Sequence, residues 1–132
     1  MLIIAYIGKL NQTNSIISEA INTSYGADIT FYEPSEIFSD PSTLDDESLD
    51  LVIVDLNTSM GLGNAPDNIQ RLSQQTPTSA LLVLHPYDNN KLIEPLVEAG
   101  ANSIISVTPT EEELSQAIDK ALSGGSYIIY PE

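Results

Sequence analysis

The stretch Asp50-Leu51-Val52-Ile53-Val54-Asp55 decides the fold of this 132-residue chain. Four consecutive branched apolar residues lie between two aspartates, without alternation of apolar and polar side chains. Such a run predicts a strand that is buried on both faces, which is typical of a parallel sheet covered by helices.

Similar apolar runs occur on both sides of this segment. They predict further strands over residues 2–7, 29–32, 80–84 and 103–107. Apolar residues at helical spacing predict helices over residues 13–25, 66–74, 90–99 and 110–123. Residues 33–50 are less regular, and we expect short helical turns around 35–38 and 44–48. Five strands alternating with helices predict an α/β protein: a single doubly wound parallel five-stranded sheet, flavodoxin-like (βα)5, in the order 2-1-3-4-5.

Capping residues and one proline predict where several helices begin or end. Thr13 or Asn11 is suited to cap the first helix, and Gly26 to end it. Thr110 and Glu113 have the spacing of a capping box. Pro95 cannot lie inside a regular helix, so that helix either begins near Glu94 or is distorted there.

The length and the net charge limit the number of domains and the classes of function. A chain of 132 residues predicts one domain over 1–132, with a core over 1–125 and a tail or linker start over 126–132. Nineteen acidic and four basic residues give a net charge of −15, which disfavours direct binding to nucleic acid or to an anionic membrane. There is no cysteine, hence no thiol chemistry, and neither a membrane span nor a secretory leader is recognisable.

The predicted topology places the working crevice at the carboxyl ends of the strands, where strands 1 and 3 diverge. Residues 5–8, 55–58 and 85–88 would meet there. Nothing among them matches a nucleophile motif or a phosphate-binding loop, so we expect no enzyme and no catalytic residue.

The chain resembles the receiver domain of bacterial two-component response regulators over nearly its whole length. Residues 50–57 resemble the segment that ends in the phosphoacceptor aspartate, and 82–88 and 98–105 resemble two later segments. Residues 117–131 resemble the end of receivers that precede a helix-turn-helix domain. His85 and Val107 follow Asp55 by 30 and 52 residues, spacings usual for this family.

The resemblance implies five functional positions, of which only the phosphoacceptor, Asp55, is kept. The acidic pair that holds Mg²⁺ is replaced by Ala5 and Tyr6, the Ser/Thr position by His85 and the Lys position by Val107. Phosphoryl transfer depends on positioning and charge neutralisation, and neither is provided by these residues. The resemblance therefore implies an atypical or pseudo-receiver branch, with phosphorylation at Asp55 weak or absent.

We expect a degenerate receiver that acts in signal transduction or transcription regulation through protein–protein contacts. One alternative is a working phosphoacceptor with a weak Mg²⁺ site at Asp55 and the backbone carbonyl of Asn57. A second alternative is a flavodoxin-like module that binds a small ligand in the same crevice. In the favoured reading no metal or cofactor is needed.

Three side chains at the crevice carry specific hypotheses. A hydrogen bond from His85 to Asp55 would occupy the phosphate position and make the site pH-sensitive. Tyr6 would either pack as an ordinary aromatic residue or fill the emptied pocket and donate its hydroxyl proton to Asp55. Tyr87 would flank the same crevice.

The resemblance also implies a partner or homodimer face formed by helix 4, strand 5 and helix 5. The candidate contacts are Leu96, Ser103, Gln116 and Lys120. A DNA-binding domain, if there is one, would lie outside this chain, and we expect a cytoplasmic location.

Overall fold

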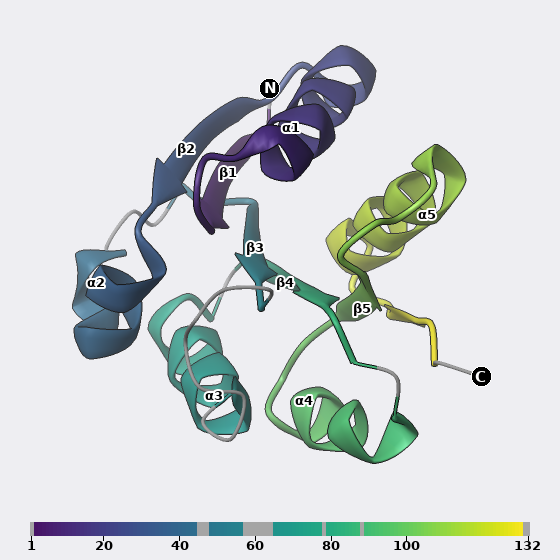
Figure 1. Ribbon diagram of the computed structural model, residues 1–132. Coiled ribbons are helices and arrows are strands. Elements are labelled where there is room, and N and C mark those ends of the chain that lie inside the picture. The colour runs from purple at the N-terminus through teal and green to yellow at the C-terminus, as the bar shows by residue number, and fades with distance from the viewer. Residues whose placement is uncertain (1, 45–47, 57–64, 78, 88, 131–132) are drawn as a thin grey trace.

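A parallel sheet lies at the centre of the computed structural model, which describes residues 2–44, 48–56, 65–77, 79–87 and 89–130 (Figure 1). Within these residues the sheet has six strands in the order β2-β1-β3-β4-β5-β6. Their bounds are β1 Ile3–Ile7, β2 Asp28–Tyr32, β3 Leu51–Asp55, β4 Ala80–His85, β5 Ser103–Ser106 and β6 Tyr127–Ile128. The α/β class and the order 2-1-3-4-5 are confirmed, with one strand added at the edge.

Helices cover both faces of the sheet. They are α1 Gln12–Tyr25, α2 Pro34–Ser39, α3 Ala65–Gln75, α4 Glu94–Glu98 and α5 Glu111–Leu122, with 3-10 turns at Pro41–Thr43 and Asn90–Leu92. Figure 1 shows α1 and α5 on one face and α2, α3 and α4 on the other. Among the described residues, no helix has the length and apolar character needed to cross a membrane.

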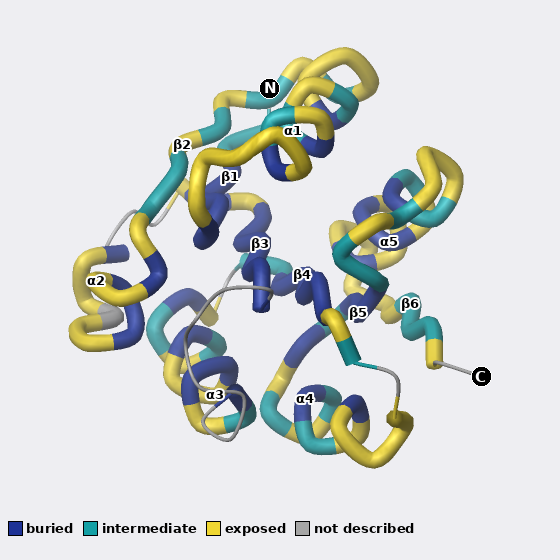
Figure 2. Tube along the Cα trace, in the orientation of Figure 1, coloured by how far each residue is buried: buried dark blue, intermediate teal, exposed yellow. Residues whose placement is uncertain are grey.

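Strand β3 is buried along its whole length, as its sequence predicted (Figure 2). Leu51 and Ile53 belong to the core beneath α1 and α5, whereas Val52 and Val54 belong to the core beneath α2, α3 and α4. Because strand side chains alternate between the two faces, a strand at the centre of three layers needs an apolar residue at every position.

The predicted caps of α1 and α5 and the predicted start of α4 are confirmed. Asn11, rather than Thr13, caps α1 by accepting a hydrogen bond from the backbone N–H of Asn14, and Gly26 ends this helix at φ 64°. Thr110 and Glu113 form the expected capping box. Helix α4 begins at Glu94, so Pro95 lies in its first turn, where no intrahelical N–H bond is lost.

Two local predictions need correction, the helix over 90–99 and the tail over 126–132. Residues 90–92 belong to the helix predicted over 90–99, but they form a separate 3-10 turn before α4, and Leu92 is 45% exposed. The early turn around 35–38 is helix α2, whereas most of the turn predicted over 44–48 lies outside the described residues. Residues 126–132 were predicted as a tail, and Tyr127 and Ile128 of this segment pair with β5 as β6.

Candidate functional site

Asp55 is the last residue of strand β3, at the carboxyl ends of the strands, where the resemblance places the phosphoacceptor. Its neighbours across the sheet are the ends of β1 and β4, with Leu84 directly beside it in the register. The side chain is only 5% exposed. A carboxylate this well covered requires polar partners, because burial of an unpaired charge is costly.

Asn14 supplies a hydrogen bond to this carboxylate. This residue lies in the first turn of α1, is 1% exposed, and donates from Nδ2 to Asp55 Oδ2 over 2.9 Å. The same Nδ2 donates to the backbone carbonyl of Lys9 over 2.7 Å. The hydroxyl of Tyr6 donates to Asn14 Oδ1 over 2.6 Å. Tyr6, Asn14 and Asp55 therefore form one buried chain of hydrogen bonds, called here the Asn14 network.

The network has only one consistent arrangement of donors. The Lys9 carbonyl can only accept, so the amide nitrogen of Asn14 must face it, and the amide oxygen then faces Tyr6. The Tyr6 hydroxyl must therefore be protonated to donate. Burial, and secondly the nearby Asp55 charge, raise the pKa of Tyr6 far above its usual value, so it stays neutral.

The expected partner of Tyr6 is corrected by this geometry. Tyr6 lies at the end of β1, where the resemblance places the acidic pair, and it is fully buried and stacked on Phe31 at 4.6 Å between ring centroids. Its hydroxyl, however, donates to Asn14 and not to Asp55. Sequence reasoning missed Asn14, for which the only sequence signal was its place in the turn capped by Asn11.

Gly8 closes the network from the side of the β1–α1 connection. A Cβ atom on Gly8 would lie 3.0 Å from Asp55 Cβ and 3.2 Å from both Asn14 Nδ2 and Tyr6 Cε1. These distances are shorter than nine in ten of the contacts that Cβ atoms make. The backbone of Gly8 therefore packs directly against all three side chains.

The residues at the strand ends do not fit the magnesium ion that the receiver resemblance implies. Mg²⁺ requires several hard oxygen ligands in octahedral geometry. Here the two carboxylate positions hold the methyl group of Ala5 and the buried ring of Tyr6. An amide N–H, which cannot ligate a cation, faces Oδ2 of Asp55. Asn57, whose carbonyl was the other ligand considered, lies outside the described residues.

His85 ends β4 and has partners other than the predicted Asp55. Its Nδ1 accepts a hydrogen bond from the backbone N–H of Tyr87 over 3.1 Å, and its ring bonds the backbone of Ile129. Since Leu84 is the register neighbour of Asp55, the next residue along β4 projects to the opposite face of the sheet. The expected His85–Asp55 hydrogen bond was therefore wrong.

Acid is expected to destabilise the fold through His85. Burial lowers the pKa of this imidazole, outweighing the opposing effect of the Ile129 backbone. The unfolded chain then binds more protons than the folded one, so this stability is complete above the unfolded pKa of about 6.5 and is lost as the pH falls from there through the lower pKa of the folded state. Urea unfolding at pH 7 and pH 5 measures this loss.

The matched control for this prediction is His85→Asn, which keeps a hydrogen-bond acceptor but cannot titrate. His85 is the sole histidine of the chain, so the difference between the two proteins isolates its contribution. An equal loss of stability between pH 7 and pH 5 in both proteins would contradict the assignment.

The remaining crevice residues gather around His85. The Tyr87 ring stacks on His85 at 5.6 Å between centroids, and burial raises the pKa of Tyr87. Val107, which the resemblance places at the lysine position, is half-buried. It lines a hollow of about 300 Å³ together with His85, Tyr87, Ile129 and Tyr130. The predicted crevice is thus divided into an Asn14 network and a separate His85 hollow.

Two of the four predicted partner contacts are not on the surface. Leu96 and Ser103 are both fully buried, and the Ser103 hydroxyl donates to the backbone carbonyl of Ala117 over 2.7 Å. Both predictions were wrong because these side chains fill the spaces between β5 and the helices. Gln116 and Lys120 are exposed on α5, as a contact residue must be.

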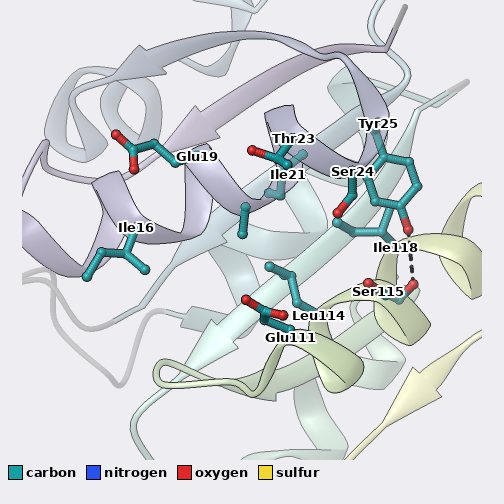
Figure 3. Close-up of a pocket in the computed structure, with 11 residues that line it drawn as sticks. Ile16, Glu19, Ile21, Thr23, Ser24, Tyr25, Glu111, Leu114, Ser115 and Ile118 are labelled. Carbon is teal, nitrogen blue, oxygen red and sulfur yellow. Dashed lines mark hydrogen bonds between the residues drawn. The ribbon is translucent and has the colours of Figure 1, made fainter.

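A second hollow, of about 380 Å³, lies between α1 and α5 (Figure 3). Apolar side chains such as Leu114 and Ile118 line it, and Ile16 at its rim is 60% exposed. Tyr25 links the two helices, with its hydroxyl 2.6 Å from Asp119 Oδ1 and 3.3 Å from the Ser115 carbonyl. Burial, and secondly the hydrogen bond to Asp119, raise the pKa of Tyr25 to about 12.

Comparison with known proteins supports the fold through structure alone. No family model matches the sequence, and no curated protein matches it either. Among solved structures, the chain is similar to a LuxR family DNA-binding response regulator from Silicibacter pomeroyi, with a TM-score of 0.76, 19% identity and coverage of 98% of this chain and 97% of the other.

Two further solved structures have the same fold. The receiver domain of RcsB from Salmonella enterica serovar Typhimurium has a TM-score of 0.76 at 12% identity, covering 97% of this chain and 93% of that chain. A response regulator from Thermotoga maritima has a TM-score of 0.71 at 20% identity, covering 93% and 99%. The chain therefore has the fold of response-regulator receiver domains, as its sequence predicted.

Proposed function

We propose that this chain is a receiver-like signalling module that works by binding proteins, with phosphorylation of Asp55 weak or absent. One observation carries the proposal. The Asp55 carboxylate is held by Asn14 Nδ2, and Asn14 in turn is held by Tyr6, whose ring occupies an acidic position of the family. A residue already paired and 5% exposed is poorly placed to attack a phosphoryl donor.

Charge supports the same conclusion. A phosphoryl group on an aspartate adds about 1.5 to 2 negative charges. The chain already has a net charge of −15, and Val107 stands where the family lysine would neutralise the group. Without a cation at this position, the charge developing in phosphoryl transfer is not compensated.

The test is incubation with acetyl phosphate and Mg²⁺, followed by intact mass measurement. We expect no phosphoryl adduct on the native chain or on Asp55→Ala, while a phosphorylatable response regulator in the same buffer acquires one. An adduct on the native chain that is lost in Asp55→Ala would overturn the proposal and identify a working phosphoacceptor. Circular dichroism confirms that both proteins are folded.

In this proposal information reaches the chain through binding. The face formed by α4, β5 and α5 binds a partner or a second copy, with Gln116 and Lys120 exposed on it. The proposal places the protein in the cytoplasm and assigns any contact with DNA to a domain outside this chain. The likeness to a LuxR family DNA-binding response regulator is the support for that last point.

A further inference from the structure

The segment Tyr127–Tyr130, called here the strap, covers the outer edge of β5. Tyr127 and Ile128 pair with Ser103 and Ile104 as a parallel strand. Beyond the pair, the Ile129 N–H donates to the Ile104 carbonyl over 3.0 Å. Figure 2 shows the strap at the end of the sheet, beside β5 and between the α4 and α5 sides.

Side chains of the strap contact both layers of the protein. Ile128 packs against the core beneath α2, α3 and α4, whereas Tyr127 and Ile129 pack against the core beneath α1 and α5. At its end, the Tyr130 hydroxyl donates to Glu94 Oε1 on α4 over 3.0 Å. The strap therefore fits its edge through specific register, packing and an anchor, and not as a loose end.

The strap is also weakly held. Its paired strand has two residues, Tyr127 to Ile129 are only half-buried, and Tyr130 is 41% exposed. A segment with few buried contacts and few backbone hydrogen bonds opens at a small fraction of the global unfolding free energy. Opening exposes the edge of β5, with unpaired backbone groups ready to receive another strand.

The connection between α5 and the strap allows the strap to detach from β5 while α5 stays folded. It reads Ser123-Gly124-Gly125-Ser126, and all four residues are exposed. Gly124 has φ 84°, a conformation that residues with a Cβ rarely adopt, and an added Cβ would meet no atom within 4 Å. The closed position of the strap thus depends on backbone freedom at Gly124.

We propose that two copies of this chain exchange straps, each inserting residues 127–130 along β5 of the other. The occupant that fits this edge best is the strap itself, because a second copy would reproduce the same register and the same Glu94 anchor. Exchange therefore needs no new contact and is controlled by the hinge and by concentration. The proposal rests on the proposed role of the α4–β5–α5 face and supplies its mode of self-association.

The absence of cysteine makes exchange measurable by disulfide formation. Residues 102 and 126 each precede a register-paired residue of β5 and β6, and the Tyr127 N–H donates to the Asn102 carbonyl over 3.3 Å, so Asn102→Cys and Ser126→Cys are the pair chosen for the link. A double variant tests the geometry within one chain. The decisive sample mixes the two single variants, where a disulfide requires two chains.

The background control replaces Asn102→Cys by Ser24→Cys, an exposed position on α1. At high protein concentration we expect the 102–126 link between chains to exceed the 24–126 link by about tenfold, since a paired strand has a high effective concentration. In these samples Gly124→Val should raise the yield of the 102–126 disulfide between chains, because it strains the closed conformation of the connection at residues 123–126. Gly125→Ala should not, because its Cβ meets the Lys120 carbonyl at 3.4 Å and its φ is not positive.

Two outcomes would overturn strap exchange, and they differ in what they say about the face. A dimer in analytical ultracentrifugation with inter-chain links at background level would reject exchange while keeping the proposed dimer face. A chain that stays monomeric at every concentration, with links only within the double variant, would reject both exchange and self-association through this face.

Discussion

Replacing Asn14 with alanine is expected to lower the free energy of unfolding by about 3 kcal/mol. The side chain makes three hydrogen bonds, to Tyr6, Lys9 and Asp55, and at 1% exposure water cannot simply replace it. Its removal leaves a hydroxyl, a carbonyl and a carboxylate oxygen without this partner. Each unsatisfied buried group costs about 1–3 kcal/mol, partly offset where the cavity admits water. Urea unfolding measures the change.

Two further variants separate the network from ordinary helix effects. Tyr6→Phe removes one hydrogen bond and should cost about 1–2 kcal/mol. The double variant should cost less than the sum of the two single variants, because the Tyr6 hydroxyl has no Asn14 partner left to lose. Asn22→Ala, exposed on the same helix, should change stability little. Strict additivity of Tyr6→Phe and Asn14→Ala would show that the network does not act as a unit.

Leu96→Ala is expected to destabilise the monomer by about 2–5 kcal/mol, the range for removing a fully buried leucine. Leu96 lies on α4 and packs in the core beneath α2, α3 and α4 at 0% exposure. A residue that contacted only a partner would instead change self-association and leave the stability of the monomer unaltered. Urea unfolding in dilute solution distinguishes these cases.

Gln116→Ala is the matched comparison for Leu96→Ala. Gln116 is exposed on α5, in the proposed binding face, and should change the free energy of unfolding by no more than about 0.5 kcal/mol. If Leu96→Ala were equally neutral in dilute solution, the packing of α4 described above would be incorrect. Near-UV circular dichroism provides an independent check that the core remains ordered in both variants.

The sequence by itself determined the class of fold and most of its elements. A run such as Leu51–Val54 reports burial on both faces, and burial on both faces of a strand requires covering helices. Capping residues such as Asn11 and Thr110 placed helix ends closely, because capping is a contact between residues three positions apart. The replaced positions that the receiver resemblance implies, from Ala5 to Val107, stay predictions.

The partners of the site residues were decided by tertiary structure. Asn14 and Asp55 are 41 positions apart, and they meet because α1 packs its first turn against the carboxyl ends of β1 and β3. His85 projects away from Asp55 because of the register between β3 and β4, which no local pattern encodes. The first fact depends on how α1 packs on the sheet, and the second on the register between two strands.

The sixth strand, at the edge of the sheet beside β5, could not be predicted from a local pattern either. Residues 127–130 read as a short apolar tail, and only their fit along β5 and the Tyr130–Glu94 contact make them a strand and its anchor. The family resemblance placed Leu96 on a partner face, and only the packing of α4 against the sheet shows that this side chain is buried. Periodicity reports which residues a local element buries, whereas the pairing of side chains across the sheet follows from how those elements are placed.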